Sequence, residues 1–171
     1  MHVGKVLSQT ARRNPQKTAV IFKDEEISFS QLELMATRLA NKLRSCKVGS
    51  AHHVAIILPN SSQWVVSYFA VMKLGAVAVP LDFRLKGEEI VPILTDAAIK
   101  GVITSDLYPE LTIFSQVESI SSVIITGEKG ADSFIKYEDV VGDESLSSAV
   151  VVDIAEEAEA LYLYTSGTTG K

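Results

Sequence analysis

Short apolar runs of strand length recur along the chain and constrain its fold more than any other feature. Four such runs contain no charged residue: VAIILP (54–59), AVAVPL (76–81), GVITS (101–105) and SVIIT (122–126). Because none of them alternates between apolar and polar residues, each is expected to be a strand that is buried on both faces. Strands of this kind belong to parallel sheets that helices cover on both sides.

Helical patterns lie between the apolar runs. In the segment 28–46, apolar residues recur at helical intervals, at Leu32, Ala36, Leu39 and Leu43. Residues 60–62 offer an N-cap for a helix that starts near Trp64, and a further helix is expected over 87–96, distorted or delayed by Pro92. Strands that alternate with helices predict the α/β class. The right-handed crossover rule then favours a doubly wound, mostly parallel sheet with helices on both faces.

The first part of the chain carries local signals of secondary structure. Residues 3–11 place apolar side chains on one face of a short helix that Asn14-Pro15 should end. The run TAVIFKDEEISF predicts two short strands around a polar turn at 23–26. Ser30 and Glu33 have the spacing of a capping box and predict the start of the next helix.

The last part of the chain is patterned less clearly. A weak helical stretch is expected around 111–117, and residues 127–159 are polar and acidic. The glutamates 156, 157 and 159 lie close together, but no His or Cys accompanies them, so a solvated surface is preferred to a metal site. The run ALYLYTS (160–166) is predicted to be the last strand.

Composition excludes several classes of function. The formal net charge is -5 and the 16 basic residues are scattered, which argues against a nucleic-acid surface. Cys46 is the single cysteine, so no intramolecular disulfide can form and a reducing setting fits best. The apolar window 64–81 is interrupted by Lys73, Gly75 and Pro80, which favours a buried helix and strand over a membrane span. With no signal peptide visible, we expect a cytoplasmic protein without a transmembrane segment.

The run YLYTSGTTGK (162–171) is rich in hydroxyl groups and glycine and raises the question of phosphate binding. A Walker P-loop would need glycine at position 165, where the chain has Thr165, so the spacing of that motif fails. The loop still offers hydroxyl donors, and its glycines let backbone approach an anion. A surface turn has the same composition, whereas a loop after a strand of an α/β sheet lies where ligands usually bind, and composition alone leaves both interpretations open.

Seven consecutive residues, Tyr164 to Gly170, match the start of the signature loop of the adenylate-forming superfamily, which commonly reads Y-T-S-G-T-T-G-x-P-K-G. This superfamily includes acyl- and aryl-CoA synthetases, adenylation domains of peptide synthetases and firefly-type luciferases. The stretches ISFSQLELMATRLANKL (27–43) and VMKLGAVAVPLDFRL (71–85) resemble its upstream core motifs in order and spacing. The chain therefore resembles the first subdomain of an AMP-binding domain. Its continuation at 81–90 looks more like the acyl-CoA synthetase, or fatty-acid-CoA ligase, branch.

The resemblance implies a two-step reaction. A carboxylic acid attacks the α-phosphate of ATP to give an acyl-adenylate and pyrophosphate, and the thiol of CoA then displaces AMP. ATP with Mg²⁺ and the co-substrate CoA are therefore implied. By matching position, the residues implied to line the phosphate site are Thr165, Ser166, Gly167, Thr168, Thr169 and Gly170. Lys171 aligns with the variable position of the signature, so the resemblance assigns no catalytic residue and no metal ligand within this chain.

Members of the superfamily are several times longer than this sequence. Residues 1–171 are therefore expected to be the N-terminal part of an AMP-binding domain, truncated within its phosphate-loop signature. We expect this part alone to be inactive and to bind no cofactor tightly. Two alternatives remain: a stand-alone non-catalytic binding module on the same scaffold, and a fragment of a peptide-synthetase adenylation domain. If 161–164 is a strand that lacks its neighbours, exposed apolar surface there would favour self-association.

Overall fold

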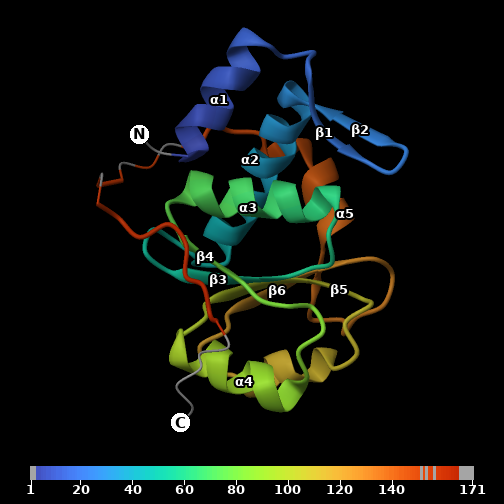
Figure 1. Ribbon diagram of the computed structural model, residues 1–171, viewed down its shortest axis with the longest axis vertical. Coiled ribbons are helices and arrows are strands. Elements are labelled where there is room, and N and C mark those ends of the chain that lie inside the picture. The colour runs from blue at the N-terminus through green and yellow to red at the C-terminus, as the bar shows by residue number, and fades with distance from the viewer. Residues whose placement is uncertain (1–2, 151, 153, 156, 166–171) are drawn as a thin grey trace.

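A five-stranded parallel sheet forms the centre of the computed structural model, which describes residues 3–150, 152, 154–155 and 157–165 (Figure 1). Its strands follow the order β4-β3-β5-β6-β7. They are β3 (His53–Ile57), β4 (Val77–Pro80), β5 (Gly101–Ser105), β6 (Ser122–Thr126) and β7 (Ile135–Lys136). A separate antiparallel hairpin joins β1 (Thr18–Phe22) to β2 (Glu25–Ser28).

Helices cover both faces of the sheet (Figure 1). One face carries α1 (Val3–Arg13), α2 (Phe29–Ser45), α3 (Ser62–Leu74) and α5 (Tyr137–Gly142). The other face carries α4 (Gly87–Asp96) and the 3-10 helix η1 (Leu111–Gln116), and a short 3-10 helix η2 (Glu144–Leu146) follows α5. The predicted α/β class, with a parallel sheet between two helical layers, is confirmed.

The central strands contribute to both hydrophobic cores because their side chains alternate between the two faces. In β3, Val54 and Ile56 pack in the core under α2 and α3, whereas Ala55 and Ile57 pack in the core under α4. All four side chains are completely buried. The uncharged runs of the sequence are therefore explained by burial on both faces of the sheet.

Helix α3 and strand β4 together account for the apolar window 64–81. Ser61 is the N-cap of α3, and its hydroxyl accepts a hydrogen bond from the backbone N–H of Trp64 at 3.2 Å. Gly75 ends the helix in the left-handed conformation, with φ of 69°, and the chain turns directly into β4. Among the described residues, no helix has the length and apolar character needed to cross a membrane.

The start of α2 differs from the prediction. Ser28, not Ser30, is the N-cap, and its hydroxyl accepts a hydrogen bond from the backbone N–H of Gln31 at 3.3 Å. The side chain of Gln31 in turn accepts from the N–H of Ser28 at 2.8 Å. The capping box predicted for Ser30 and Glu33 is therefore wrong. Ser28 ends β2 with extended backbone, so the helix already begins at Phe29.

Three further predictions are corrected by the structure. The turn of the hairpin is shorter than 23–26, because β2 already begins at Glu25. Helix α4 begins at Gly87 and continues through Pro92, so the proline does not delay it. The polar region 127–159 contains β7 and α5, which the sequence did not predict.

Candidate functional site

The predicted phosphate loop is described in the structure at its first residue. Thr165 is exposed and lies outside the helices and strands. The other predicted residues of the site, Ser166, Gly167, Thr168, Thr169 and Gly170, lie outside the described residues, as does Lys171. What can be built from the structure is therefore the segment that leads into the loop, residues 160–165.

This segment runs along the outer edge of β4. The backbone N–H of Ala78 donates to the carbonyl oxygen of Ala160 at 3.0 Å, and the N–H of Tyr162 donates to the carbonyl oxygen of Ala78 at 2.9 Å. The two bonds form an isolated parallel bridge between Ala78 and Leu161. The strand predicted from ALYLYTS is thus reduced to a single bridge, and the exposed Leu163 lies beyond it.

Tyr164, the residue directly before the loop, is held by a carboxylate. Its hydroxyl donates a hydrogen bond to Oδ2 of Asp96, the last residue of α4, at 2.7 Å. Partial burial, followed by this hydrogen bond, raises the pKa of Tyr164 to about 12. The phenol therefore stays protonated and keeps donating through the physiological pH range.

Tyr162 makes a second side-chain contact from the same segment. Its ring centroid lies 5.5 Å from that of His53, the first residue of β3, and 6.1 Å from that of Tyr164. The Nδ1 atom of His53 lies 2.5 Å from the carbonyl oxygen of Ala97, which follows the last residue of α4. The end of α4, the start of β3 and the two tyrosines therefore meet at one place.

This meeting place lies at the amino-terminal edge of the sheet. His53 begins β3, and the N–H of Lys100, just before β5, donates to the carbonyl oxygen of His53 at 2.9 Å. Ligands of open α/β sheets bind beside the carboxyl ends of the strands. The hydroxyl of Tyr164 is thus fixed at the opposite edge from the one that the general rule for α/β sheets favours.

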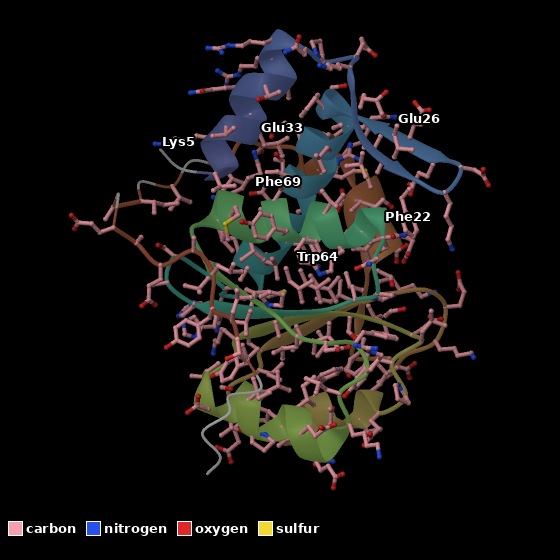
Figure 2. All side chains as sticks on the ribbon, in the orientation of Figure 1. Lys5, Phe22, Glu26, Glu33, Trp64 and Phe69 are labelled. Carbon is pink, nitrogen blue, oxygen red and sulfur yellow. The ribbon has the colours of Figure 1, made fainter. Side chains whose placement is uncertain are left out.

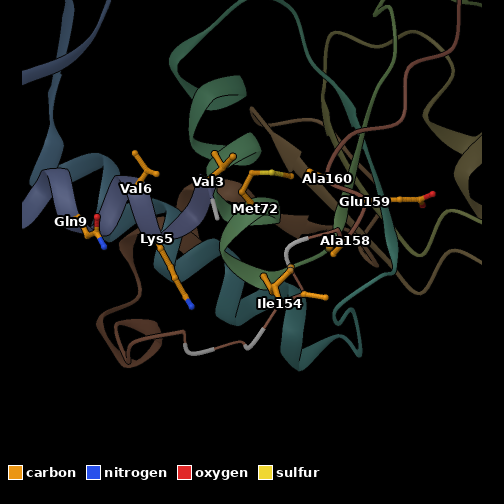
Figure 3. Close-up of a pocket in the computed structure, with 12 residues that line it drawn as sticks. Val3, Lys5, Val6, Gln9, Met72, Ile154, Ala158, Glu159 and Ala160 are labelled. Carbon is orange, nitrogen blue, oxygen red and sulfur yellow. The ribbon is translucent and has the colours of Figure 1, made fainter. Parts of the chain in front are cut away.

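A pocket in the described part of the chain does not coincide with the predicted loop. It has a volume of about 450 Å³ and lies between α1, the end of α3 and residues 154–155 and 158–160 (Figure 3). Its lining includes the apolar side chains of Val3, Val6, Met72 and Ile154, together with Lys5. Thr165 is not among the lining residues. The polar groups of its lining are Lys5, Gln9 and Glu159, and no bond between them is found among the described residues, so this hollow is assigned no site of its own.

A buried ion pair joins the first three helices. The Nζ atom of Lys73 donates to Oε1 of Glu33 at 2.6 Å and to the hydroxyl of Ser8 at 3.0 Å, and Ser8 donates to Glu33 at 2.9 Å. Glu33 is labelled in Figure 2. The side chain of Lys73 is 5% exposed and that of Glu33 is 26% exposed. The two charges are paired with each other through Oε1 of Glu33, whereas Oε2 of the same carboxylate is buried and has no hydrogen-bond partner among the described residues. We therefore interpret this cluster as structural, although it stands beside a hollow of about 440 Å³.

Arg84 follows β4 and is exposed. Its guanidinium donates to Oδ2 of Asp82 at 2.7 Å, and its backbone N–H donates to Oδ1 of the same carboxylate at 2.9 Å. These bonds lower the pKa of Asp82 to about 2. The Arg84 side chain thus bonds to a carboxylate of its own loop.

Metal-ligating residues do not cluster in the described part of the chain. Within it, no group of three or more His, Cys, Asp or Glu side chains is placed to hold a metal ion. The two adjacent histidines are used separately: Nδ1 of His52 accepts from the N–H of Gly49, and His53 contacts the end of α4. The aromatic residues Trp64, which is labelled in Figure 2, and Tyr68 are partly buried against the core, which fits a structural role.

Comparisons of the sequence with known proteins agree with one another. The family profile described as "AMP-binding enzyme" matches residues 7–171. The long-chain-fatty-acid–CoA ligase FadD13 of Mycobacterium tuberculosis is 28% identical over 172 aligned positions, which cover 99% of this chain and 33% of that protein. Surfactin synthase subunit 2 of Bacillus subtilis is 29% identical over 171 positions, which cover 100% of this chain and 4% of that protein.

The fold also resembles that of a solved CoA ligase. The crystal structure of the anthranilate CoA ligase AuaEII in complex with anthranoyl-AMP matches with a TM-score of 0.86 and 25% identity. The match covers 99% of this chain and 33% of the ligase. The chain spans about a third of the length of the CoA ligases that it matches.

Proposed function

Because the chain belongs to the family of AMP-binding enzymes, we propose that it is the N-terminal part of an ATP-dependent acyl-CoA synthetase. In the proposed reaction, a carboxylic acid and ATP give an acyl-adenylate and pyrophosphate, and CoA then takes the acyl group as a thioester. The observation that carries the proposal is the family match over 7–171, which includes the signature residues 164–170. Similarity to FadD13 favours the CoA-ligase branch.

Thr165 fits a phosphate site. Its side chain is exposed, it follows the anchored Tyr164, and its hydroxyl can donate to a phosphate oxygen. We assign the same task to the hydroxyls and backbone amides of the residues that follow it in the signature, Ser166, Gly167, Thr168, Thr169 and Gly170. Neutral donors suit this task because pyrophosphate must leave after the first step, and neutral hydrogen bonds hold an anion less tightly than charged ones do.

Mg²⁺ is assigned no protein ligand in the part of the chain that the structure describes. Those residues contain no cluster of carboxylates or histidines suited to a metal ion. Mg²⁺ is commonly bound by phosphate oxygens with one or two carboxylates, so the nucleotide itself can supply most of its ligands. When bound, the ion neutralises charge that develops on the leaving pyrophosphate.

Nucleotide titration tests the proposed phosphate loop. We expect ATP with Mg²⁺ to shift the NMR signals of residues 165–170, and replacement of two loop hydroxyls by Thr165→Val and Thr168→Val to weaken that response. Thr18→Val removes an exposed hydroxyl from β1 and is the matched control. Shifts confined to other parts of the chain, or an unchanged response in the double variant, would contradict the assignment.

The chain of 171 residues is proposed to be inactive by itself. We expect no release of pyrophosphate when it is mixed with ATP, Mg²⁺ and a panel of carboxylic acids. The reason is that it spans about a third of related ligases, so most residues of a complete site lie outside it. Release above a buffer control would overturn this proposal.

Two alternatives remain open. Similarity to surfactin synthase subunit 2 keeps a part of a peptide-synthetase adenylation domain possible, and the fold alone is compatible with a binding module that performs no chemistry. The coding DNA beyond the codon of Lys171 discriminates between enzyme and module. Continuation into Pro-Lys-Gly favours the enzyme, and a stop codon favours the module.

Self-association is a further proposal, carried by the row of exposed side chains beside β4. Leu161, Tyr162 and Leu163 are 44%, 43% and 63% exposed, next to a sheet edge. Burying such a row between two copies would remove apolar surface from water. Analytical ultracentrifugation should then show dimers at high concentration, and a monomeric mass would count against the proposal.

A cytoplasmic location is the other expectation from the sequence. Cell fractionation tests it.

A further inference from the structure

Negative charge is distributed unevenly along the chain. Residues 1–23 contain five Lys or Arg residues and no Asp or Glu, and all 21 acidic residues stand from Asp24 onwards. The positive charges occur throughout the chain, so the asymmetry arises because acidic residues are missing from its start. The first helix therefore carries positive charge in a chain whose formal net charge is -5.

The basic side chains of α1 and the turn that follows it are exposed. We name four of them the basic face: Lys5, Arg12, Arg13 and Lys17. Lys5 and Arg12 are seven positions apart in α1, which places them on the same side of the helix, and both line one hollow. Among the residues that the structure describes, Arg12, Arg13 and Lys17 form no salt bridge.

Acidic side chains near the basic face are few. Glu33 lines the same hollow as Arg12, and its charge is paired with the buried lysine of α3. Glu159 lines a hollow together with Lys5. The turn of the hairpin is acidic as well, but Figure 2 shows Lys5 and Glu26 on opposite sides of this end of the molecule. Positive charge therefore dominates around the C-terminal end of α1.

The opposite end of the molecule is acidic. The layer of α4 and η1 lies across the sheet from the layer that contains α1 (Figure 1). Residues 81–118, which include α4 and η1, contain seven acidic and three basic residues. Two helical layers with a sheet between them are about 20 Å apart, which is more than twice the Debye length at physiological salt. An external charged surface therefore interacts with the two ends separately.

We propose that the basic face binds the surface of an anionic phospholipid membrane. Each Lys or Arg close to such a surface adds to the attraction, and salt screens the acidic end, which is held away from it. Leu34 is 39% exposed and lines a hollow with Arg12, so it adds an apolar side chain at the interface. Leu7 and Ala11 of α1 are buried in the protein, so the helix lies on the membrane and does not insert.

A nucleic acid is the other polyanion that fits a basic face. Residues 3–17 contain no aromatic residue, so this face offers nothing that stacks on exposed bases. A membrane requires no such group, because charge alone attracts basic side chains to anionic lipids. In the proposed orientation, Tyr164 and its partner Asp96 of α4 face the solution. The proposal is therefore independent of the proposed phosphate loop.

Two triple variants of the 171-residue chain test the basic face. The first removes three of its charges, by Arg12→Gln, Arg13→Gln and Lys17→Gln. The second removes the same net charge from exposed positions elsewhere, by Lys47→Gln, Lys86→Gln and Lys129→Gln. Co-sedimentation is measured with vesicles of phosphatidylcholine alone and of phosphatidylcholine with about one-third phosphatidylserine. Circular dichroism controls for folding.

The expected results separate the basic face from net charge. The parent chain should bind the anionic vesicles and not the neutral ones, and added salt should release it. The first triple variant should bind about a hundredfold more weakly at low salt, and the second less than about threefold more weakly. The variant Arg12→Lys with Arg13→Lys keeps the charge and should bind like the parent chain. On anionic vesicles, amide exchange should slow within 3–17 and stay unchanged within 87–96.

Three results would overturn the proposal. The first is equal binding of the parent chain to both kinds of vesicle, or binding to neither. The second is an equal loss of binding in the two triple variants, which would attribute it to net charge. The third is tighter binding to double-stranded DNA than to anionic vesicles at equal phosphate concentration, which would assign the face to nucleic acid. If the first triple variant is unfolded, the exchange data decide, and protection outside 3–17 alone would refute the proposal.

Discussion

Two salt bridges of almost equal length lie in very different surroundings. In the layer of α1, α2 and α3, Lys73 lies 2.6 Å from Glu33, and the two side chains are 5% and 26% exposed. In the loop after β4, Arg84 lies 2.7 Å from Asp82, and the side chains are 87% and 48% exposed. Because water screens exposed charges, equal distances do not give equal contributions to stability. Burial decides which pair the fold depends on.

The hydrogen bond between Tyr164 and Asp96 is intermediate in burial between these two salt bridges. It joins a partly buried phenol to the exposed carboxylate of the last residue of α4. Its expected contribution is to the order of one segment rather than to the stability of the whole fold. The comparison therefore separates contacts that hold the scaffold from contacts that hold the segment before the candidate site.

The largest expected effect belongs to the buried pair. Glu33→Ala should lower the free energy of unfolding by about 3 kcal/mol, the low end for a broken buried pair, because it leaves the Lys73 ammonium buried without its counter-charge. Urea denaturation measures the change. Glu118→Ala removes an exposed carboxylate and should cost less than about 0.5 kcal/mol. Equal losses in the two variants would show that burial does not distinguish this pair.

Replacing both partners should have a smaller effect than replacing one. Glu33→Leu with Lys73→Met leaves no unpaired charge, and the hydroxyl of Ser8 keeps its bond to the carbonyl oxygen of Gly4. The double variant should lie within about 1 kcal/mol of the parent chain, because apolar replacement of a buried ion pair is often neutral. The same denaturation series, with each single variant included, checks this. A double variant as unstable as the sum of the single variants would contradict it.

The sequence predicts the centre of the fold well because local composition and burial agree there. The runs at 101–105 and 122–126 coincide with β5 and β6, since both strands are covered on both faces and can contain no charge. Strand β7 has two residues, Ile135 and Lys136, and exists because it pairs with β6. No local pattern of residues encodes such pairing. For the same reason, the run at the end of the chain could not be distinguished from a full strand.

The candidate site is predictable from a motif but not from the contacts that support it. The signature identifies the loop at 165–170, whereas the partners Asp96 and Tyr164 are 68 positions apart and neither stands in a recognisable pattern. Glu33 was assigned to a local cap by its spacing, although its partner Lys73 is 40 positions away. A lysine within an otherwise apolar helix was the available sign that a buried acidic partner exists.

Ionisation of Tyr164 tests the contribution of its hydrogen bond to Asp96. Its pKa is raised from 10.0 to about 12, so the stability that its protonated form contributes is present below pH 10 and is lost as the pH rises towards 12. The difference in tyrosinate absorbance between the parent chain and Tyr164→Phe isolates this group from the other tyrosines. Asp96→Ala should lower the titration midpoint of Tyr164 towards 10. Partial burial should keep that midpoint above 10. An unchanged midpoint would show that the hydrogen bond to Asp96 does not contribute.

The smallest expected effect on stability belongs to the exposed pair. Arg84→Ala should leave the urea midpoint at neutral pH unchanged, as Lys129→Ala should on another exposed loop, because an ion pair in water gains little. Its effect should appear instead in the titration of Asp82. The pKa of this carboxylate is lowered from 3.8 to about 2, first by the side-chain hydrogen bond from Arg84 and then by the backbone N–H of the same residue.

The backbone bond survives the substitution, so the pKa of Asp82 should rise only part of the way towards 3.8. Any stability linked to this group is present above pH 3.8 and is lost as the pH falls towards 2, so a difference between the variant and the parent chain should be confined to that acid range. NMR of the carboxyl carbon of Asp82 follows the titration directly. A shifted urea midpoint at neutral pH would show that this loop, despite its exposure, contributes to the fold as the buried pair does.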